Sequence, residues 1–310
     1  MERIFSLVLL LALTACSFRG TDPLQTGTEP ASVIETTPSP QPGSPTLPPG
    51  ADITLEQLRN AEYQLGLLDQ IRTVQLTDGV FQEGAEADFI AVRMQEILAV
   101  GDLDGDGSNE AVVPVAENYG GSGVFVFLAV YTFENNQPIF LTSVAIDDRP
   151  IIEALSIENR EIYLAATIHA FNDAMCCPTL ATMRHYRLTN TGLLMTDFST
   201  KTPTGADRII TISAPADGAE ASGVISIQGE ISIAPFENNL VYRIYDAGGV
   251  EVVAGPIEVS APDLGAPGTF ERSIDLSAFG GTSIRIVVQD VNAADGSLFA
   301  MDSIILTVRE

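Results

Sequence analysis

Ser283-Ile-Arg-Ile-Val-Val-Gln-Asp-Val291, near the end of a 310-residue chain, has apolar side chains at alternate positions, Ile284, Ile286 and Val288. Such an alternation predicts a β-strand with one buried face, because successive side chains of a strand point to opposite sides. The same alternation recurs at two other places in the last hundred residues, at Ile225 and Ile227 and at Ile304, Leu306 and Val308. We therefore expect this part of the chain to be built from strands.

About seven strand-like runs, separated by turns such as Ala294-Asp295-Gly296, fill residues 207–310. This number and spacing predict an immunoglobulin-like β-sandwich. Trp is absent from the chain, so the buried Trp of antibody domains is missing and apolar packing must hold the unit. The predicted strands are 208–213, 224–229, 240–246, 250–259, 268–276, 283–291 and 303–309.

The same unit resembles the immunoglobulin-like domain of bacterial spore germination, of the type associated with GerMN domains. The resemblance rests on an I-x-x-x-x-P-x-x-G-A segment, an Ile-Gln-Gly turn, a Phe-Glu-Asn-Asn element, a Gly-Thr-Phe strand and a late D-x-x-x-x-D-G. These lie at 210–219, 227–229, 236–239, 268–270 and 290–296. The resemblance implies an extracytoplasmic interaction module, and it implies neither catalysis nor spore formation.

Residues 51–200 are predicted to form a first folded unit. Thr54 and Gln57 have the spacing of a capping box, which predicts a short helix over 55–63. Most later segments resemble strands, and they are separated by turn residues such as Glu134-Asn135-Asn136. We expect a mainly β fold in which an antiparallel meander with a small helix precedes the sandwich. Examples of the predicted strands are 73–76, 97–101, 111–115, 124–133, 151–157, 162–168 and 183–188.

The most chemically specific motif of this unit is G-D-L-D-G-D-G-S-N-E, residues 101–110. Carboxylates at every second position, with a glycine that permits a sharp turn, can converge on one hard cation, and we expect calcium. Val113 stands where an EF-hand has its bidentate Glu, and strand-like segments flank the loop, so an EF-hand is excluded. The alternative is a hydrated turn without an ion.

The motif is similar to the calcium loops of integrin-type FG-GAP repeats, which lie between two apolar strands. By that resemblance, the ligands would be the side chains of Asp102, Asp104 and Asp106, the carbonyl of Ser108, and Glu110. Such repeats need several copies to close a propeller, and a single copy predicts no propeller. The expected role of the ion is structural, because it would cancel carboxylate repulsion and fix the turn.

The first sixteen residues have the pattern of an export signal. A ten-residue apolar run over 4–13 follows Arg3, which is too short to span a membrane. It ends in Leu13-Thr14-Ala15-Cys16, which resembles the lipobox of bacterial lipoproteins. The resemblance implies that residues 1–15 are a signal peptide and that Cys16 receives lipid, including palmitate. Residues 16–50, rich in Pro, Thr and Ser, are predicted to be a disordered linker.

The formal charge of −26 limits the choice of partners. A strongly acidic chain repels phosphate backbones, so we expect no binding to nucleic acid. The predicted partners are the membrane, through the Cys16 lipid, and an envelope protein or polysaccharide. The predicted location is extracytoplasmic, with the chain anchored by lipid to the cell membrane.

Cys176-Cys177-Pro178 contains the other two cysteines of the chain. Outside the cytoplasm they could form a vicinal disulfide, remain free thiols or pair with another chain. The segment around them is similar to a Cys-Cys-Pro-Ser segment of some actinobacterial lipoproteins, the LppP/LprE group, with Thr179 in place of Ser. A structural turn is the favoured interpretation, and a redox or metal role is the alternative.

No catalytic constellation is evident in the sequence. Ser122 lies in a glycine-rich stretch that predicts a hairpin loop, and His169 and His185 are predicted to be partly buried strand residues. No spacing brings them together with Asp173. The sequence therefore predicts a binding or structural protein of the cell envelope, stabilised by calcium. The alternative is an envelope enzyme, or a thiol-redox accessory protein, with its site in the first unit.

Overall fold

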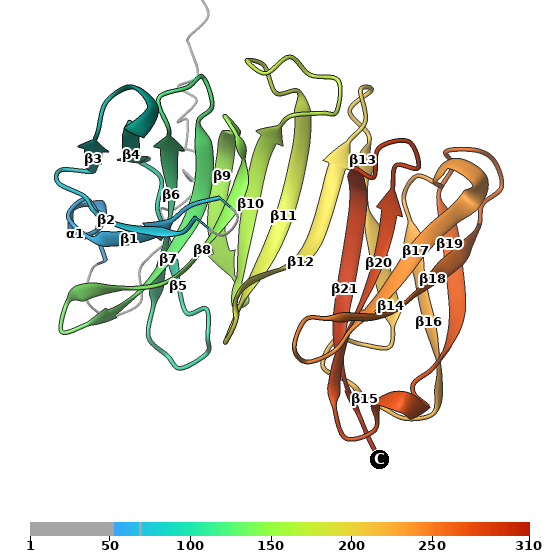
Figure 1. Cartoon of the computed structure of the whole chain (residues 1–310). Coiled ribbons are helices and arrows are strands. Elements are labelled where there is room, and N and C mark those ends of the chain that lie inside the picture. Colours follow the sequence, from blue (N-terminus) through green and yellow to red (C-terminus); the bar gives the residue numbers. More distant parts are fainter. Residues whose placement is uncertain (1–52, 68–69) are drawn as a thin grey trace, which may run out of the picture. The chain divides into compact units, whose positions relative to one another are not determined.

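Strand β7 (Phe125–Glu134) is central to the N-terminal unit because both of its faces are buried. Phe127, Ala129 and Tyr131 pack into one apolar core, and Val126, Leu128 and Val130 pack into another. A strand that is apolar at successive positions must be covered on both sides. The computed structural model, which describes residues 53–67 and 70–310, meets this requirement with three layers of β-structure (Figure 1).

The middle layer is an antiparallel sheet with the strand order β3-β4-β6-β7-β8, in which β5 also pairs with β6. Except where β5 intervenes, neighbours in this sheet are consecutive strands, so the predicted antiparallel meander is confirmed. The bounds are β3 (Val80–Glu83), β4 (Ile90–Met94), β5 (Ala99–Gly101), β6 (Glu110–Asn118) and β8 (Gln137–Asp148), with a 3₁₀ turn at Glu86–Asp88.

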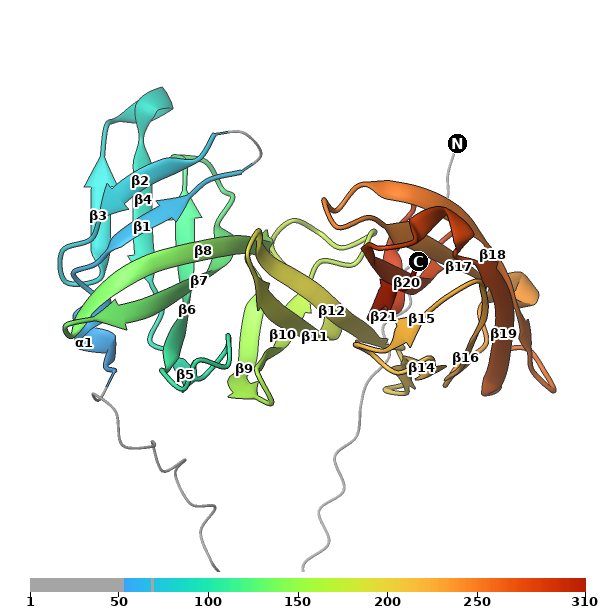
Figure 2. The ribbon, with the colours of Figure 1, turned by 90° about the horizontal axis from the view of Figure 1, so that it is seen from below.

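The outer layers cover the two faces of this sheet. Helix α1 (Leu55–Leu58) and the hairpin of β1 (Glu62–Leu65) and β2 (Arg72–Gln75) pack on the face of Tyr131. Figure 2 shows this blue hairpin beside β4 and β6. The opposite face packs against an antiparallel sheet whose buried side chains include Ile162, Leu164 and Tyr186. Its strands are β9 (Ile151–Glu158), β10 (Glu161–Ile168), β11 (Leu180–Thr189) and β12 (Gly192–Lys201).

Helix α1 is shorter than the sequence predicts. The capping box is formed, with the Thr54 N–H donating to Gln57 Oε1 at 2.8 Å, but the helix ends at Leu58 instead of residue 63. Glu62 instead begins β1, where it pairs with Gln75. The cap fixes where the helix begins, whereas pairing with a later strand decides where it ends.

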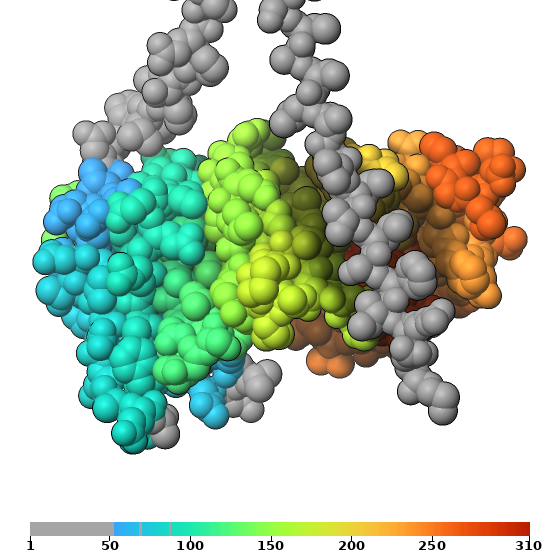
Figure 3. All heavy atoms as spheres, turned by 90° about the horizontal axis from the view of Figure 1, so that it is seen from above, coloured from blue at the N-terminus to red at the C-terminus, as the bar shows by residue number. Residues whose placement is uncertain are grey.

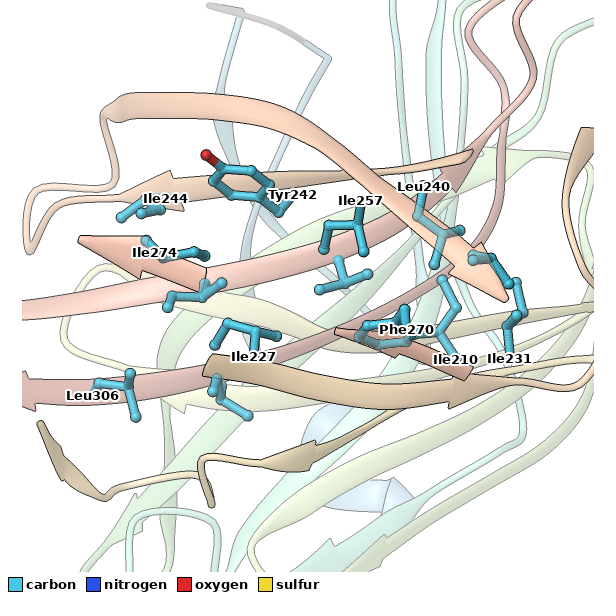
Figure 4. Close-up of a cluster of buried hydrophobic side chains, with 14 of the residues drawn as sticks. Ile210, Ile227, Ile231, Leu240, Tyr242, Ile244, Ile257, Phe270, Ile274 and Leu306 are labelled. Carbon is cyan, nitrogen blue, oxygen red and sulfur yellow. The ribbon is translucent and has the colours of Figure 1, made fainter. Parts of the chain in front are cut away.

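The C-terminal unit is a sandwich of two sheets, joined because β18 pairs with strands of both. Figure 4 shows its apolar core, to which one sheet contributes Ile227 and Phe270 and the other contributes Leu240 and Leu306. The first sheet contains β14 (Ile210–Ala214), β16 (Val224–Ile231) and β19 (Gly268–Asp275). The second contains β17 (Asn239–Tyr245), β18 (Glu251–Ser260), β20 (Ser283–Val291) and β21 (Leu298–Val308). Shorter elements are β13 (Asp207–Arg208), β15 (Glu220–Ala221) and 3₁₀ turns at Phe236–Asn238 and Ser277–Phe279.

Strands β12 and β21 pair antiparallel through Asp197 with Asp302 and Phe198 with Met301. Through these pairs the sheet of β9–β12 continues into the sandwich. Among the residues that the structure describes, no helix is both long enough and apolar enough to cross a membrane.

Candidate functional site

The acidic loop, residues 102–109, is the hairpin connection between β5 and β6, whose last pair is Gly101 with Glu110. Asp102, Asp104 and Asp106 each offer a carboxylate oxygen, and these oxygens lie within 4.8 Å of one another. The prediction that alternate aspartates would point to one place therefore agrees with their positions. At such separations two carboxylates repel by about 1 kcal/mol in water and by more near a protein surface.

Hydrogen bonds inside the acidic loop hold these carboxylates in place. Asp102 accepts the N–H of Gly105 at 2.6 Å and the N–H of Gly107 at 3.1 Å. Asp106 accepts the Ser108 N–H at 2.6 Å. Gly105 and Gly107 have φ of 84° and 89°, a left-handed conformation that side-chain-bearing residues rarely adopt. The turn is thus built by the aspartates and glycines of the motif.

Glu110 is placed differently from the three aspartates. Its side chain is buried, and its Oε2 accepts the Leu103 N–H at 2.9 Å. This hydrogen bond holds the first residues of the acidic loop in place. Burial raises the pKa of Glu110, the bond from Leu103 opposes this, and the nearby aspartates raise it further. The group of converging oxygens contains the three aspartates and does not include Glu110.

Arg160, from the turn between β9 and β10, reaches the acidic loop from the neighbouring sheet. Its guanidinium donates to the backbone carbonyl of Asp104 and lies against Gly105, where a Cβ atom would be 2.4 Å from Cζ. Asp104 and Arg160 also line a hollow of about 610 Å³, together with polar residues of the 189–192 turn. The converging atoms of the acidic loop are carboxylate oxygens of Asp102, Asp104 and Asp106, a ligand type that hard cations such as Ca²⁺ prefer.

The cysteine loop, residues 169–179, connects β10 to β11 and projects at the top of Figure 1. Cys176 and Cys177 are joined as a disulfide, and both residues are exposed. Asp173 accepts hydrogen bonds from the N–H of Ala170 at 2.8 Å and from the N–H of Thr179 at 2.7 Å. These bonds and one from the Thr179 hydroxyl lower the pKa of Asp173. Asp173 thus joins the beginning of this loop, at Ala170, to its end, at Thr179.

His169, Ser122 and His185 do not form a catalytic group with Asp173. His169 is partly buried, as predicted, but it follows the last residue of β10 and is therefore not in the strand. Its N–H donates to Asp147 at 2.7 Å, and its Nε2 lies 3.2 Å from the Met175 carbonyl. Ser122 lies in the loop between β6 and β7, as predicted. His185 lies in β11 with its ring 4.2 Å from that of Tyr163.

Residues 209–297 match the family model of the immunoglobulin-like domain of bacterial spore germination. The C-terminal unit is an immunoglobulin-like domain. No curated protein and no solved structure matches the chain.

The match to the immunoglobulin-like domain ends before β21, yet β21 pairs with β20 along its length and supplies Ile304 and Leu306 to the core. The Ile-Gln-Gly segment, predicted as a turn, lies within strand β16. Gly229 of this segment allows β16 to approach Thr211 and Phe270 closely. A Cβ atom there would be 2.2 Å from the Thr211 carbonyl oxygen and 2.4 Å from the Phe270 ring. The glycine of this motif is therefore a packing residue.

A buried polar cluster in the N-terminal unit has no counterpart in the sequence predictions. Glu117 is fully buried; its Oε2 accepts the Tyr119 hydroxyl at 2.6 Å, and its Oε1 lies 3.6 Å from Arg72 Nε. Burial raises the pKa of Glu117. One feature of the sequence could have indicated that Glu117 is buried: it occupies the next alternate position after the apolar residues Ala111, Val113 and Val115. Only the fold shows that Arg72 meets it.

A second such cluster lies where β12 pairs with β21. Asp197 and Asp302 are directly opposed across the two strands. Burial, followed by the charges of Asp302 and Glu161, raises the pKa of Asp197 to about 7. Two acidic residues about a hundred positions apart give no sequence signal of this contact.

Proposed function

We propose that this chain is a lipid-anchored, extracytoplasmic protein that acts as a binding or structural module of the cell envelope. The observation that supports this most directly is the Leu13-Thr14-Ala15-Cys16 motif after a short apolar run. These residues and the linker over 16–50 lie outside the described part of the structure. The immunoglobulin-like domain at 209–297 supports an interaction role, because such sandwiches present loops and strand edges to partners.

The proposal includes a calcium ion in the acidic loop. It is supported by the three converging aspartates and by the left-handed turns at Gly105 and Gly107. Its role is structural, since a divalent cation offsets the repulsion among Asp102, Asp104 and Asp106. The loop connects β5 to β6 of the middle sheet, so the ion would stabilise the hairpin of these two strands.

The anchor is tested by growing an expressing bacterium with labelled palmitate and isolating the full chain. We expect label on the wild type and none on Cys16→Ser. The Cys176→Ser variant is the matched control, because it also loses one cysteine and should keep its label. An unlabelled wild type, or a labelled Cys16→Ser, would contradict the anchor.

The envelope role is tested by co-sedimentation of the full-length protein with isolated cell-wall polysaccharide and by capture from envelope extracts. Both are done with calcium and with a chelator. We expect retention that persists in Cys16→Ser, because binding would then reside in the folded units and not in the lipid. If no polysaccharide or envelope protein is retained, the binding role is wrong.

A further inference from the structure

We propose that the Cys176–Cys177 disulfide is a thiol–disulfide exchange site that accepts electrons from a dithiol, and is not a structural crosslink. The inference does not depend on calcium or on the lipid anchor. It rests on three features of the cysteine loop: how little the bond connects, what holds the loop without it, and how open it is to a reagent.

The disulfide joins neighbours in the sequence, so it links no separate parts of the fold. A disulfide stabilises a fold chiefly by closing a loop in the unfolded chain, and this effect grows with the length of that loop. Two adjacent residues close the shortest loop possible. Stabilisation of the folded state therefore gives a weak reason for this bond.

The conformation of the cysteine loop is held by other groups. Asp173 accepts the N–H groups of Ala170 and Thr179 and the Thr179 hydroxyl, which closes the loop at its base. Asp147 of β8 accepts the His169 N–H, and this anchors the beginning of the loop to the central sheet. None of these contacts requires the sulfur atoms to be bonded. The loop can therefore remain in place when the disulfide is reduced.

The disulfide is open to attack from solution. Cys176 and Cys177 are both exposed, and their neighbours Phe171 and Met175 are 73% and 65% exposed. In Figure 3, seen from above, the yellow-green stretch that includes this loop faces the viewer. Exposed disulfides are the labile class, because a thiolate can reach the sulfur along the line of the bond. The apolar side chains around the pair give an approaching protein dithiol a surface to contact.

The exchange takes place in two displacement steps. A thiolate of the dithiol attacks Sγ of Cys176 or Cys177, the bond between the two sulfurs breaks, and a mixed disulfide forms while the other sulfur leaves as a thiolate. The second thiol of the reductant, as its thiolate, displaces the attacked cysteine. In total, the pair gains two electrons and two protons and becomes two thiols, and the dithiol is oxidised to its own disulfide.

The test uses the full chain with Cys16→Ser, so that Cys176 and Cys177 are the only cysteines. Free thiols are counted over time in dithiothreitol, with the protein native and in denaturant. We expect two thiols per chain and a native rate within about tenfold of the denatured rate, because the bond is exposed. A slower native rate, or two free thiols before any reductant is added, overturns the proposal.

Two further measurements separate exchange from a structural role. In mixtures of reduced and oxidised glutathione, the pair should shift between both forms, whereas a bond that stays oxidised throughout overturns the proposal. Reduction should move the melting midpoint by less than about 2 °C, and a larger loss would show a structural crosslink. Cys176→Ser and Cys177→Ser should each take up one glutathione, and the double variant should take up none.

Discussion

At the scale of single residues, Asp106 is the position at which the proposed calcium site can be tested. Its Oδ1 accepts the Ser108 N–H at 2.6 Å, which shapes the turn, and its charge adds to those of Asp102 and Asp104. Asp106→Asn keeps an oxygen for the Ser108 N–H and removes the charge. The substitution therefore separates the construction of the turn from the proposed binding of calcium.

We expect millimolar calcium to raise the melting midpoint of the wild type relative to a chelator. The gain is about 2.7 kcal/mol when free calcium is a hundred times its Kd, or several degrees for a chain of this size. Asp106→Asn should lose most of this shift, whereas Glu258→Gln, which removes an exposed charge from β18, should keep it. Equal midpoints for the wild type in calcium and in chelator would show that the loop binds no calcium with useful affinity.

At the scale of elements, Gly229 determines how closely β16 packs on its neighbours. A Cβ at this position would overlap the Thr211 carbonyl oxygen of β14 and the Phe270 ring of β19. Gly229→Ala must therefore move a strand, and we expect a loss of about 1–3 kcal/mol in urea unfolding. Gly121→Ala is the matched control, since no atom lies within 4 Å of a Cβ there. Equal losses in the two variants would contradict the close approach.

Strand β7 allows a second test at this scale. Leu128 is fully buried between the central sheet and the sheet of β9–β12, whereas Leu141 of β8 is 40% exposed. Leu128→Ala leaves a cavity and should reduce the free energy of unfolding by about 2–5 kcal/mol. Leu141→Ala removes the same atoms from a half-exposed site and should cost under about 1 kcal/mol. Chemical denaturation measures both, and a smaller loss for Leu128→Ala would contradict a three-layer core.

How much of these elements could be predicted from the sequence depends on whether the signal is local. Strands β7 and β20 can be recognised from the sequence, because each shows its burial within a single segment. Strand β7 is a continuous apolar run, and β20 has apolar residues at alternate positions. Strand β3 has no alternating burial, so only its pairing with β4 places it. The convergence of Asp102, Asp104 and Asp106 could also be predicted, because these residues lie within five positions of one another. The approach of Arg160 to Asp104 joins segments 56 residues apart, and no local pattern of the sequence indicates it. Glu110 lies only seven residues from Leu103, but its burial and its bond to the Leu103 N–H appear only in the folded hairpin.

At the scale of the whole molecule, polar contacts accompany the pairing of β12 with β21. Arg187 of β11 bridges Glu161 and Asp217, with N–O distances of 2.9 Å to each carboxylate. Arg285 donates to the Met195 carbonyl, and burial lowers the pKa of Arg285 to about 10. The Ser303 hydroxyl donates to the Thr196 carbonyl at 2.9 Å. The connection between the sheet of β9–β12 and the immunoglobulin-like domain is therefore charged, and its stability should depend on pH.

Asp197 gives this dependence its sign. Its folded pKa of about 7 lies above the value of about 4 expected in the unfolded chain. Below pH 4 the carboxyl is protonated in both states. Between pH 4 and 7 the unfolded chain loses the proton while the folded protein retains it, so the free energy of unfolding falls as the pH rises. Above pH 7 both states are ionised and the loss is complete.

Asp197→Asn should remove this part of the pH dependence, because a neutral amide faces Asp302 and Glu161 at every pH. We expect the variant to exceed the wild type by about 1–3 kcal/mol in urea unfolding at pH 8 and to converge with it near pH 4. Asp302 also has a pKa raised by burial, so some slope should remain in the variant. Asp263→Asn, in an exposed loop, should parallel the wild type. If Asp197→Asn also ran parallel to the wild type, the opposed carboxyls would not be what makes this connection sensitive to pH.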